Sequence, residues 1–352
     1  MVVAMSGGVD STVVAALLQQ AGYEVEGVTA QLWETAAAGG SSDRAAGPAA
    51  PAAARLGIPL HAVDATELFQ RQVIDPFVQS YVAGSTPNPC VECNRYVKFG
   101  LLLDWALEQG ADYLATGHYA RIRHRDGTYQ LLRAADVGRD QSYVLYRLTQ
   151  AQLSRIFFPL GEHTKEQVRA IARDLALPNA ERPDSQDICF IPGRDYRDFV
   201  AQRMPAAMQP GPIFDNQGRL LGRHRGMAAY TIGQRQGLNL TSAEPLYVLQ
   251  LDVQNNALVV GRRRDAACSR FSTTDTHWIA PTDPRDHPDR LHVQIRYRSQ
   301  PVAARVQTGA NGRAEVELDT LLNDVTPGQA AVFYCGEVCL GGGTIAAREK
   351  RA

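Results

Sequence analysis

The sequence lacks any apolar run long enough to cross a lipid bilayer, because polar or charged residues interrupt every hydrophobic stretch well before about 20 residues. Its N-terminus also lacks the basic segment, apolar core and small-residue cleavage site that together form a secretory signal. We therefore expect a soluble protein of the cytoplasm that has no membrane partner.

Cysteine is scarce, at 6 of 352 residues, which is too few for a scaffold held together by disulfides. In a reducing compartment, the spacing of so few thiols indicates reaction chemistry or metal binding. The chain is also longer than the size at which a single hydrophobic core stops growing, so we expect two or three domains.

Net charge is small, at −1, which by itself disfavours a nucleic acid partner. The charge is uneven along the chain, however. Residues 1–195 carry 17 Lys and Arg against 22 Asp and Glu, residues 196–270 carry 10 against 5, and residues 271–352 carry 9 against 10. The surplus in the middle region is typical either of a solvated face or of a surface that binds a phosphate backbone.

The most informative stretch is Ser6-Gly-Gly-Val-Asp-Ser11, between the apolar run Val2–Ala4 and a helical pattern over residues 12–18. A strand, a Gly turn and a helix in that order surround a small volume with backbone N–H groups, which favours binding of phosphate oxygens. The Asp and Ser side chains can cap the helix or hold a metal. No Walker-type Gly-Lys-Ser/Thr follows, and Gly-x-Gly-x-x-Gly is absent. The two glycines alone leave a simple turn as the alternative.

Alternating strands and helices follow this stretch, which predicts a doubly wound parallel α/β sheet with ligands at the carboxyl ends of its strands. The elements we expect are strands over 24–30, 58–64 and 112–119, and helices over 64–81 and 99–108.

Two further segments of the α/β region have sequence signals of their own. Residues 35–54 are rich in Ala, Gly and Ser and contain Pro48 and Pro51, which predicts an irregular segment and not one unbroken helix. Thr164 and Gln167 predict a capping box at the start of a helix over 164–175.

The α/β pattern fades after Phe190 and gives way to short apolar runs separated by Gly, Asn, Asp and Pro. These runs predict β-rich modules, the last of them a small barrel or sandwich; they are residues 246–249, 257–260, 291–295, 314–318 and 330–334. We therefore predict a nucleotide-binding catalytic domain over 1–195, a basic central module over 196–270 and a C-terminal β-barrel over 271–352.

Cys90 and Cys93 are three residues apart and follow two prolines that flank Asn88. Such a pair is typical of half a zinc site, of a redox pair or of part of a cluster. Zinc would need two more ligands, for which His118 and Cys189 are candidates, and two incidental buried thiols are the remaining alternative. The prolines favour function, because they stiffen a loop that would otherwise be free to move.

The other cysteines carry weaker signals. Cys189 by itself is typical of a buried strand residue. Cys268, Cys335 and Cys339 have no accompanying polar motif, so we expect them to be structural.

Eight motifs occur in order along nearly the whole chain, and together they resemble the tRNA-specific 2-thiouridylases of the PP-loop ATP pyrophosphatase superfamily. The motifs are Ser6–Ser11, Thr86–Asn94, Ala115–Tyr119, Asp140–Tyr143, Asp184–Phe190, Tyr230–Arg235, Pro327–Gln329 and Gly336–Gly343.

The resemblance implies that the wobble uridine of tRNA exchanges its C2 oxygen for sulfur. ATP would adenylate that oxygen and release pyrophosphate, which turns a poor leaving group into AMP. The family's ATP site, with Mg²⁺, corresponds to Ala4, Met5, Ser6, Gly7, Gly8, Val9, Asp10, Ser11, Ala30 and Gly117. Ala30 stands where relatives carry a bulkier residue.

The resemblance also implies that Cys189 carries the incoming sulfur as a persulfide, delivered by a sulfur donor protein. Cys93 would then release the sulfur or resolve the persulfide as a disulfide, because a second thiolate must supply electrons when the S–S bond breaks. Cys90 stands where many relatives carry Asp, a possible general acid or base. Either Cys90 takes over that role, or Cys90, Cys93 and Cys189 hold three irons of a [4Fe–4S] cluster.

For tRNA, the resemblance implies contacts with the target base, with the anticodon loop, and with other parts of that loop through the barrel. The target base would be contacted by Asn88, Pro89, Cys90 and His118. The anticodon loop would be contacted by Arg139, Asp140 and Gln141, and other parts of that loop by Arg296, Tyr297 and Gln329. Without the resemblance, we would expect Arg296, Tyr297 and Arg298 on a strand as a solvated face. Arginines of the central module, including 219, 223, 225 and 262–264, would contact tRNA phosphates.

Two other functions stay open from the sequence. An amide-forming ligase shares the Ser-Gly-Gly-x-Asp-Ser loop but has no need of Cys93 and Cys189. An RNA-binding protein with a degenerate nucleotide site is the non-catalytic alternative. Pyrophosphate release that depends on tRNA would distinguish the thiouridylase from both.

Overall fold

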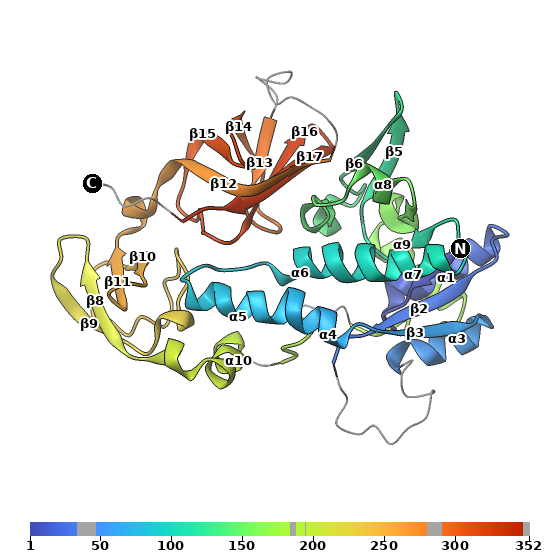
Figure 1. The fold of residues 1–352 in the computed structure, drawn as a ribbon, viewed down its shortest axis with the longest axis horizontal. Coiled ribbons are helices and arrows are strands. Elements are labelled where there is room, and N and C mark those ends of the chain that lie inside the picture. The colour runs from blue at the N-terminus through green and yellow to red at the C-terminus, as the bar shows by residue number, and fades with distance from the viewer. Residues whose placement is uncertain (34–46, 184–187, 194, 280–290, 348–352) are drawn as a thin grey trace.

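The computed structural model describes residues 1–33, 47–183, 188–193, 195–279 and 291–347. Figure 1 shows an α/β part that carries the N-terminus, a barrel of long strands, and a smaller sheet on the far side from the N-terminus. Within the ranges described, no helix is long and apolar enough to cross a membrane. The predicted fold class, a parallel α/β sheet followed by a β-rich module and a barrel, is confirmed.

The N-terminal sheet is parallel throughout, and its order in the described residues is β3-β2-β1-β4-β7. The strands are β1 (Val2–Ala4), β2 (Glu26–Gln31), β3 (Leu60–Asp64), β4 (Leu114–Ala115) and β7 (Ile156–Phe157). The chain runs outward from β1 to β3 and then returns to place β4 on the other side of β1. The carboxyl end of β1 is therefore a topological switch point, where open α/β sheets bind their ligands.

Helices cover both faces of this sheet, because neighbouring residues of β1 point to opposite sides. Val3 packs in one cluster with residues of α1 (Val9–Gln20), α3 (Ala50–Leu56) and α9 (Lys165–Asp174). Val2 packs in another with residues of α7 (Leu103–Glu108). Both valines are at most 3% exposed, so the sheet is the core of the α/β part.

Two long helical segments contain π-helical turns, which frequently mark functional sites. The first consists of α4 (Thr66–Phe69), the π-helical residues Gln70–Ile74 and α5 (Asp75–Val82), close to the prediction. The second consists of α6 (Pro89–Glu92), the π-helical residues Cys93–Leu102 and α7. The predicted start at residue 99 is therefore wrong by ten residues.

The cysteine pair consequently lies on a helix and not on a loop. Pro89 occupies the first turn, where a missing N–H costs no hydrogen bond. Asn88 caps the helix, since its side-chain oxygen accepts a hydrogen bond from the Cys90 N–H at 3.2 Å. The prolines that signalled a stiff loop thus define a helix start.

Two local predictions have different outcomes. The capping box of α9 is confirmed, with Thr164 and Gln167 each bonded to the other's backbone N–H. Residues 35–46 of the predicted irregular segment lie outside the described residues. Residues 50–54 belong to α3, so that prediction is wrong there, because Pro51 lies in the first helical turn, where proline is tolerated.

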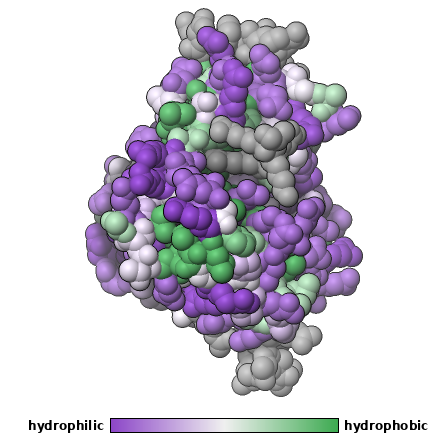
Figure 2. Space-filling view, turned by 90° about the vertical axis from the view of Figure 1, so that its left-hand side faces the viewer, coloured by the Kyte–Doolittle hydropathy of each residue, from purple (hydrophilic) through white to green (hydrophobic). Residues whose placement is uncertain are grey.

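The central module is a mixed sheet of order β10-β11-β8-β9, preceded by α10 (Tyr196–Arg203). Its strands are β8 (Gly211–Asp215), β9 (Leu220–His224), β10 (Tyr247–Asp252) and β11 (Ala257–Gly261). Figure 2 shows the molecule from this side, with an area of hydrophobic residues (green) among mostly hydrophilic ones (purple). The exposed apolar side chains of the module include Leu220 and Leu221 on β9.

The C-terminal strands close into an antiparallel barrel, because β12 pairs with both β15 and β17. Its strands are β12 (Cys268–Trp278), β13 (Leu291–Gln294), β14 (Val302–Thr308), β15 (Ala314–Leu322), β16 (Ala330–Cys335) and β17 (Val338–Ile345). A hairpin of the α/β part, β5 (Arg121–Arg125) and β6 (Thr128–Leu132), joins the barrel through β6 and β17. We did not predict this hairpin, because β5 alternates with charged residues.

The remaining helical elements are short. They are α8 (Gln150–Leu153) and the 3₁₀ turns Gly47–Ala49, Val137–Arg139, Ser142–Val144, Pro159–Glu162, Pro205–Met208, Met227–Ala229 and Arg263–Ala266.

A buried ion pair of the α/β part, between Arg133 and Asp140, lies against the barrel. Asp140 is 9% exposed, and its carboxylate accepts hydrogen bonds from Arg133 Nη1 at 3.0 Å and from the Ser142 hydroxyl at 2.8 Å. The Arg133 guanidinium lies 3.6 Å from the centroid of the Tyr334 ring and also donates to Gln294 Oε1 at 3.0 Å. The position of the barrel therefore depends on this pair.

Asp140→Asn should lower the midpoint of thermal unfolding by about 5–10 °C, because breaking a buried ion pair costs about 3 kcal/mol. The control is Glu67→Gln, which removes the same charge from an exposed pair whose Arg71 nitrogen lies 3.7 Å away. We expect that control to shift the midpoint by less than about 1 °C. Equal midpoints for the two variants would contradict the structural role of Asp140.

Candidate functional site

The predicted phosphate loop lies at the switch point, between the carboxyl end of β1 and the first turn of α1. Gly7 has a φ of 76°, and a Cβ atom there would lie 2.4 Å from the Pro48 carbonyl oxygen. Only glycine fits this position. The Ser6 N–H donates to the Ser11 hydroxyl at 3.3 Å, and the Gly8 N–H donates to the Ser6 hydroxyl at 3.4 Å. These bonds hold the loop closed over the helix N-terminus, a favourable place for anions.

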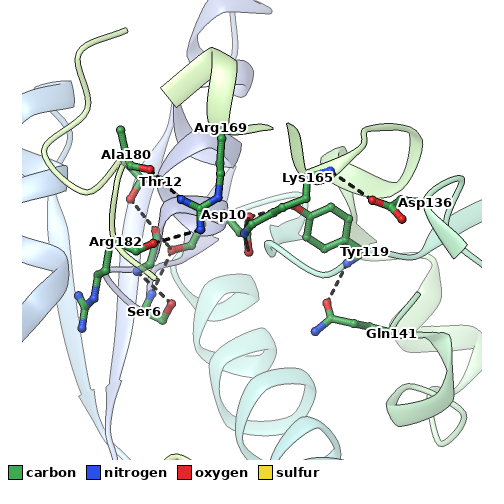
Figure 3. A network of polar contacts seen from close by, with 12 residues as sticks. Ser6, Asp10, Thr12, Tyr119, Asp136, Gln141, Lys165, Arg169, Ala180 and Arg182 are labelled. Carbon is green, nitrogen blue, oxygen red and sulfur yellow. Dashed lines mark hydrogen bonds and ion pairs between the residues drawn. The ribbon is translucent and has the colours of Figure 1, made fainter. Parts of the chain in front are cut away.

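A lysine that we did not predict faces the loop. Lys165 is 4% exposed, and its Nζ lies 2.7 and 2.9 Å from the two carboxylate oxygens of Asp10 (Figure 3). The Tyr119 hydroxyl also donates to Asp10, at 2.9 Å. The capping box at Thr164 was the available signal, because it fixes Lys165 as the first residue of α9.

Two more unpredicted side chains reach the loop from the segment after α9. Asn179 Nδ2 donates to the Gly7 carbonyl at 3.1 Å and to the Thr12 hydroxyl at 2.8 Å. Arg182 Nη1 donates to the same Gly7 carbonyl at 3.1 Å. With Lys165, these groups surround the loop with hydrogen-bond donors and positive charge, an arrangement that suits a polyanionic phosphate. No sequence signal identified them, because they lie about 170 residues away along the chain.

The donors of the loop fit phosphate better than a metal ion. Mg²⁺ sites in proteins use one or two carboxylates together with substrate oxygens. Asp10 is the carboxylate of this loop, and both its oxygens already accept hydrogen bonds from Lys165. A magnesium ion there would have to displace the lysine nitrogen.

The other predicted ATP residues lie around the same sheet edge. Ala30 is near the end of β2, in register with Val63 of β3, and Met5 is buried at 2% exposed. Gly117 packs against α1, where a Cβ atom would lie 2.9 Å from the Ser11 nitrogen. The assignment of these residues to the ATP site remains a prediction.

The segment Thr116–Tyr119 connects the phosphate loop with the cysteine helix. Gly117 and Tyr119 contact Ser11 and Asp10, as described above. His118, between them, is 6% exposed and its Nε2 lies 3.3 Å from Lys98 Nζ, five residues after Cys93 on the helix. One tetrapeptide therefore touches both candidate reaction sites.

The structure brings the predicted catalytic cysteines to one region, which we call the thiol site (Cys90, Cys93 and Cys189). Cys93 and Phe190, the neighbour of Cys189, pack against the same apolar cluster around Phe69 and Val97. Desolvation raises the pKa of all three thiols, that of Cys189 to about 12, although Cys90 and Cys189 remain exposed residues. Positive charge on Lys98 acts against this rise at each thiol.

The thiol site does not have the arrangement of a metal centre in the described residues. Within the described ranges, no group of three or more His, Cys, Asp or Glu side chains is placed to hold a metal ion. In the described residues, the three thiols are therefore not arranged as ligands of a cluster or of a zinc ion. Residues 184–187 of the motif before Cys189 lie outside the described residues.

Three motifs from three parts of the chain meet at Thr86. The Thr86 N–H donates to the Pro327 carbonyl at 2.8 Å, and its hydroxyl donates to the Thr231 hydroxyl at 3.2 Å. Gln329 Nε2 donates to the Thr86 carbonyl at 2.8 Å. Gly328 has a φ of 89°, and a Cβ atom there would lie 2.8 Å from the Thr86 nitrogen. The barrel and the central module therefore hold the segment that leads to Asn88.

A cavity of about 380 Å³ lies beside this junction, between α5, the start of α6 and the barrel. Its lining includes Phe77, Asn88, Pro89, Glu92 and Tyr146. Two of the predicted base contacts, Asn88 and Pro89, thus border an open volume.

The other predicted tRNA contacts differ in their surroundings. Asp140 is buried in the ion pair described above, so its carboxylate has protein partners on both oxygens. Gln141 accepts a hydrogen bond from the Tyr119 N–H at 2.9 Å, and Arg139 is partly exposed in a 3₁₀ turn. Their contact with tRNA remains a prediction, and for Asp140 a structural role is present as well.

Without the resemblance, we expected a strand at Arg296, Tyr297 and Arg298, and this expectation is wrong. Strand β13 ends at Gln294, and the Ser299 N–H donates to the Arg296 carbonyl to form a turn. Arg296 Nη2 donates to the Thr326 hydroxyl at 2.7 Å, and Tyr297 is 38% exposed. The turn presents these side chains beside the Pro327–Gln329 motif.

The basic residues of the central module are only partly available for phosphate. Arg219 is paired with Asp215 at 2.7 Å, and Arg262 with Glu244 at 2.9 Å. Arg263 and Arg264 are exposed and line a second, open cavity of about 250 Å³ together with Tyr247. These two are the stronger candidates for phosphate contact.

Family models match the three parts of the chain in turn. Residues 1–193 match the tRNA methyl transferase HUP domain, residues 197–262 the tRNA methyl transferase PRC-barrel domain, and residues 268–345 the aminomethyltransferase beta-barrel domain. The first model alone covers more than half of the chain.

Solved structures match only partially. The U34-tRNA thiolase NcsA from Methanococcus maripaludis is 19% identical, with a TM-score of 0.34 over 58% of this chain and 64% of that chain. Similarity at this level carries no argument about the present chain.

Curated relatives match over the full length. The tRNA-specific 2-thiouridylase MnmA of Chloroflexus aurantiacus is 48% identical over 99% of this chain and 98% of its own length. The protein of the same name from Carboxydothermus hydrogenoformans is 46% identical over 99% of this chain and 97% of its own length. The chain therefore belongs to the tRNA-specific 2-thiouridylase family.

Proposed function

We propose that this chain replaces the C2 oxygen of the wobble uridine of tRNA with sulfur, at the expense of ATP, in the cytoplasm. Thiolation of tRNA uridine follows from membership of the family. The observation that carries the detailed proposal is the position of Thr116–Tyr119, which contacts Asp10 and Ser11 on one side and Lys98 of the cysteine helix on the other. Activation of an oxygen and delivery of sulfur can therefore act on one base.

In the activation step, the uridine O2 attacks the α-phosphorus of ATP. A new O–P bond forms, the bond to the β-phosphate bridge breaks, and pyrophosphate leaves with both electrons. The loop N–H groups at residues 6–11, Lys165 and Arg182 would hold the pyrophosphate, and they are already oriented before the reaction. Their charge favours a product that is more anionic than the bound end of ATP.

In the sulfur step, Cys189 carries a persulfide supplied by a sulfur donor protein. The terminal sulfur attacks C2 and expels AMP, and the Cys93 thiolate then attacks Cys189 Sγ. The S–S bond to the transferred sulfur breaks, so the product is 2-thiouridine and a Cys93–Cys189 disulfide. An external dithiol reduces that disulfide for the next turnover. The common packing of Cys93 and Phe190 supports this pairing.

The tRNA would lie across the junction at Thr86. Asn88, Pro89 and Cys90 face the target base next to the cavity of about 380 Å³, an arrangement suited to a base removed from its stack. Tyr297 offers an exposed ring for stacking, and Arg263 and Arg264 offer charge for the backbone.

Lys165→Met should slow tRNA-dependent pyrophosphate release by about 100-fold or more, because it removes a preorganised cation from the leaving group. The rate is measured with saturating tRNA and ATP. The matched control is Arg173→Met at the other end of α9, a half-exposed cation remote from the loop, which should keep the wild-type rate. An unchanged rate in Lys165→Met would remove the lysine from the phosphate site.

Cys189→Ala should abolish thiolation from a persulfide donor while tRNA-dependent pyrophosphate release continues. Mass spectrometry of tRNA nucleosides measures 2-thiouridine, and a coupled assay measures pyrophosphate. Cys268→Ala, at a partly exposed thiol of the barrel, serves as the control and should retain both activities. Full thiolation by Cys189→Ala would exclude the persulfide assignment.

The double variant Arg263→Gln/Arg264→Gln should weaken tRNA binding and flatten its dependence on salt. Each phosphate contact contributes about 0.7–0.9 to the slope of log affinity against log salt, so we expect a decrease of about 1.5. Arg71→Gln, an exposed arginine of the α/β part, should leave the slope unchanged. Identical slopes for all three proteins would show that the central module does not contact the backbone.

A further inference from the structure

Lys98 lies on the same face of the helix as Cys93. The residues from Cys93 to Leu102 are π-helical, and in such a stretch the backbone hydrogen bond joins residues five positions apart, so the fifth residue on lies one turn further along on nearly the same side. Lys98 is the fifth residue after Cys93, and its charge acts on all three thiols of the thiol site. An ordinary α-helix would place a residue at this spacing off to one side.

The one polar contact of the Lys98 ammonium in the described residues is with His118. The distance from Nζ to His118 Nε2 is 3.3 Å, and His118 Nδ1 lies 2.6 Å from the Thr116 hydroxyl. An ammonium group can only donate hydrogen bonds, so Nε2 must accept and the ring must carry its proton on Nδ1. Burial and Lys98 together lower the pKa of His118, which keeps the ring neutral. The histidine therefore orients Lys98 without neutralising its charge.

The two lysines of the candidate site differ in this respect. Lys165 is paired with Asp10, whereas no carboxylate of the described chain lies within ion-pair distance of Lys98. Besides His118, the Lys98 charge affects the three thiols, at each of which it opposes the effect of burial. With no anionic partner among the described residues, the Lys98 ammonium is arranged to receive an anion.

We propose that Lys98 is a positioning residue for sulfur transfer, whose ammonium holds anionic sulfur between Cys189 and Cys93. The inference rests on the proposed function and adds the charge that this reaction requires. A persulfide anion on Cys189 and a thiolate on Cys93 are both negative, so they repel each other unless a cation lies beside them. Orientation of that cation by neutral His118 leaves its full charge for the sulfur.

The test compares two alkylating reagents that differ in charge. Iodoacetate is an anion and iodoacetamide is neutral, and both react with the thiolate, so the ratio of their rates reports local charge and cancels differences in thiol ionisation and access. Peptide mass spectrometry measures the two rates at Cys93 and Cys189 in the full-length protein. Lys98→Met should lower the iodoacetate-to-iodoacetamide ratio by about fivefold to tenfold at both cysteines, and Lys98→Arg should restore it.

The matched control is Arg95→Met, which removes a positive charge three residues earlier on the same helix. Arg95 Nη1 lies 3.7 Å from Asp275 of the barrel, so its charge is directed away from the thiols, and the ratio should stay at the wild-type value. Lys98→Gln provides a second neutral variant in case Lys98→Met does not fold. A wild-type ratio in both neutral variants, or an equal decrease in Arg95→Met, would overturn the proposal.

A second readout separates this inference from the proposed function. Lys98→Met should lower the rate of thiolation by about tenfold or more, with unchanged pyrophosphate release and tRNA affinity. The alkylation ratio requires neither tRNA nor ATP. Wild-type protein that fails to thiolate tRNA would refute the proposed function, whereas a ratio that responds to Lys98 in that protein would still support the positioned charge.

Discussion

The contact between Gly117 and the N-terminus of α1 is the constraint on which the site depends. A Cβ atom at residue 117 would lie 2.9 Å from the Ser11 nitrogen and 3.0 Å from Asp10 atoms, so only glycine permits this approach. The contact joins the carboxyl ends of β1 and β4, the neighbouring strands at the switch point. Because Gly117 is held in this position, its neighbour Tyr119 contacts Asp10 and its neighbour His118 contacts Lys98. Backbone packing thus sets the distance between the phosphate loop and the thiol site.

The barrel and the central module act on the site through the junction at Thr86. Main-chain and side-chain bonds from Pro327, Gln329 and Thr231 converge on this residue, two positions before Asn88. The Arg133–Asp140 pair and an apolar cluster that includes Tyr143 and Tyr334 hold the barrel against the α/β part. Gln329, which the resemblance assigns to tRNA, therefore also holds the segment that leads to Asn88. An anticodon loop bound at this junction would directly affect the position of the target base.

Desolvation and charge oppose each other at the thiol site. Desolvation raises the pKa of Cys93 and Cys189, which favours the thiol form at neutral pH. Lys98 supplies the opposing charge among the described residues, and burial keeps His118 beside it neutral. The phosphate loop follows another arrangement, in which Lys165 already has a carboxylate partner. Lys98, in contrast, has no carboxylate within ion-pair distance among the described residues.

The sequence by itself determined that a parallel α/β sheet precedes the β-rich module and the barrel. It also determined the phosphate loop, the capping box of α9 and, through eight ordered motifs, the family. These are properties of local pattern: period-2 and helical periodicity, turn residues and short strings of fixed spacing. The start of the cysteine helix at Pro89, the β5–β6 hairpin, and the placement of Lys98, Lys165, Asn179 and Arg182 came only from the tertiary structure. A lone Lys or Asn carries no local signal of its role in the sequence, because that role depends on which distant part of the chain its side chain contacts. These contacts join residues far apart in the sequence, such as Asn179 and Gly7, so the few residues that a motif covers do not encode them.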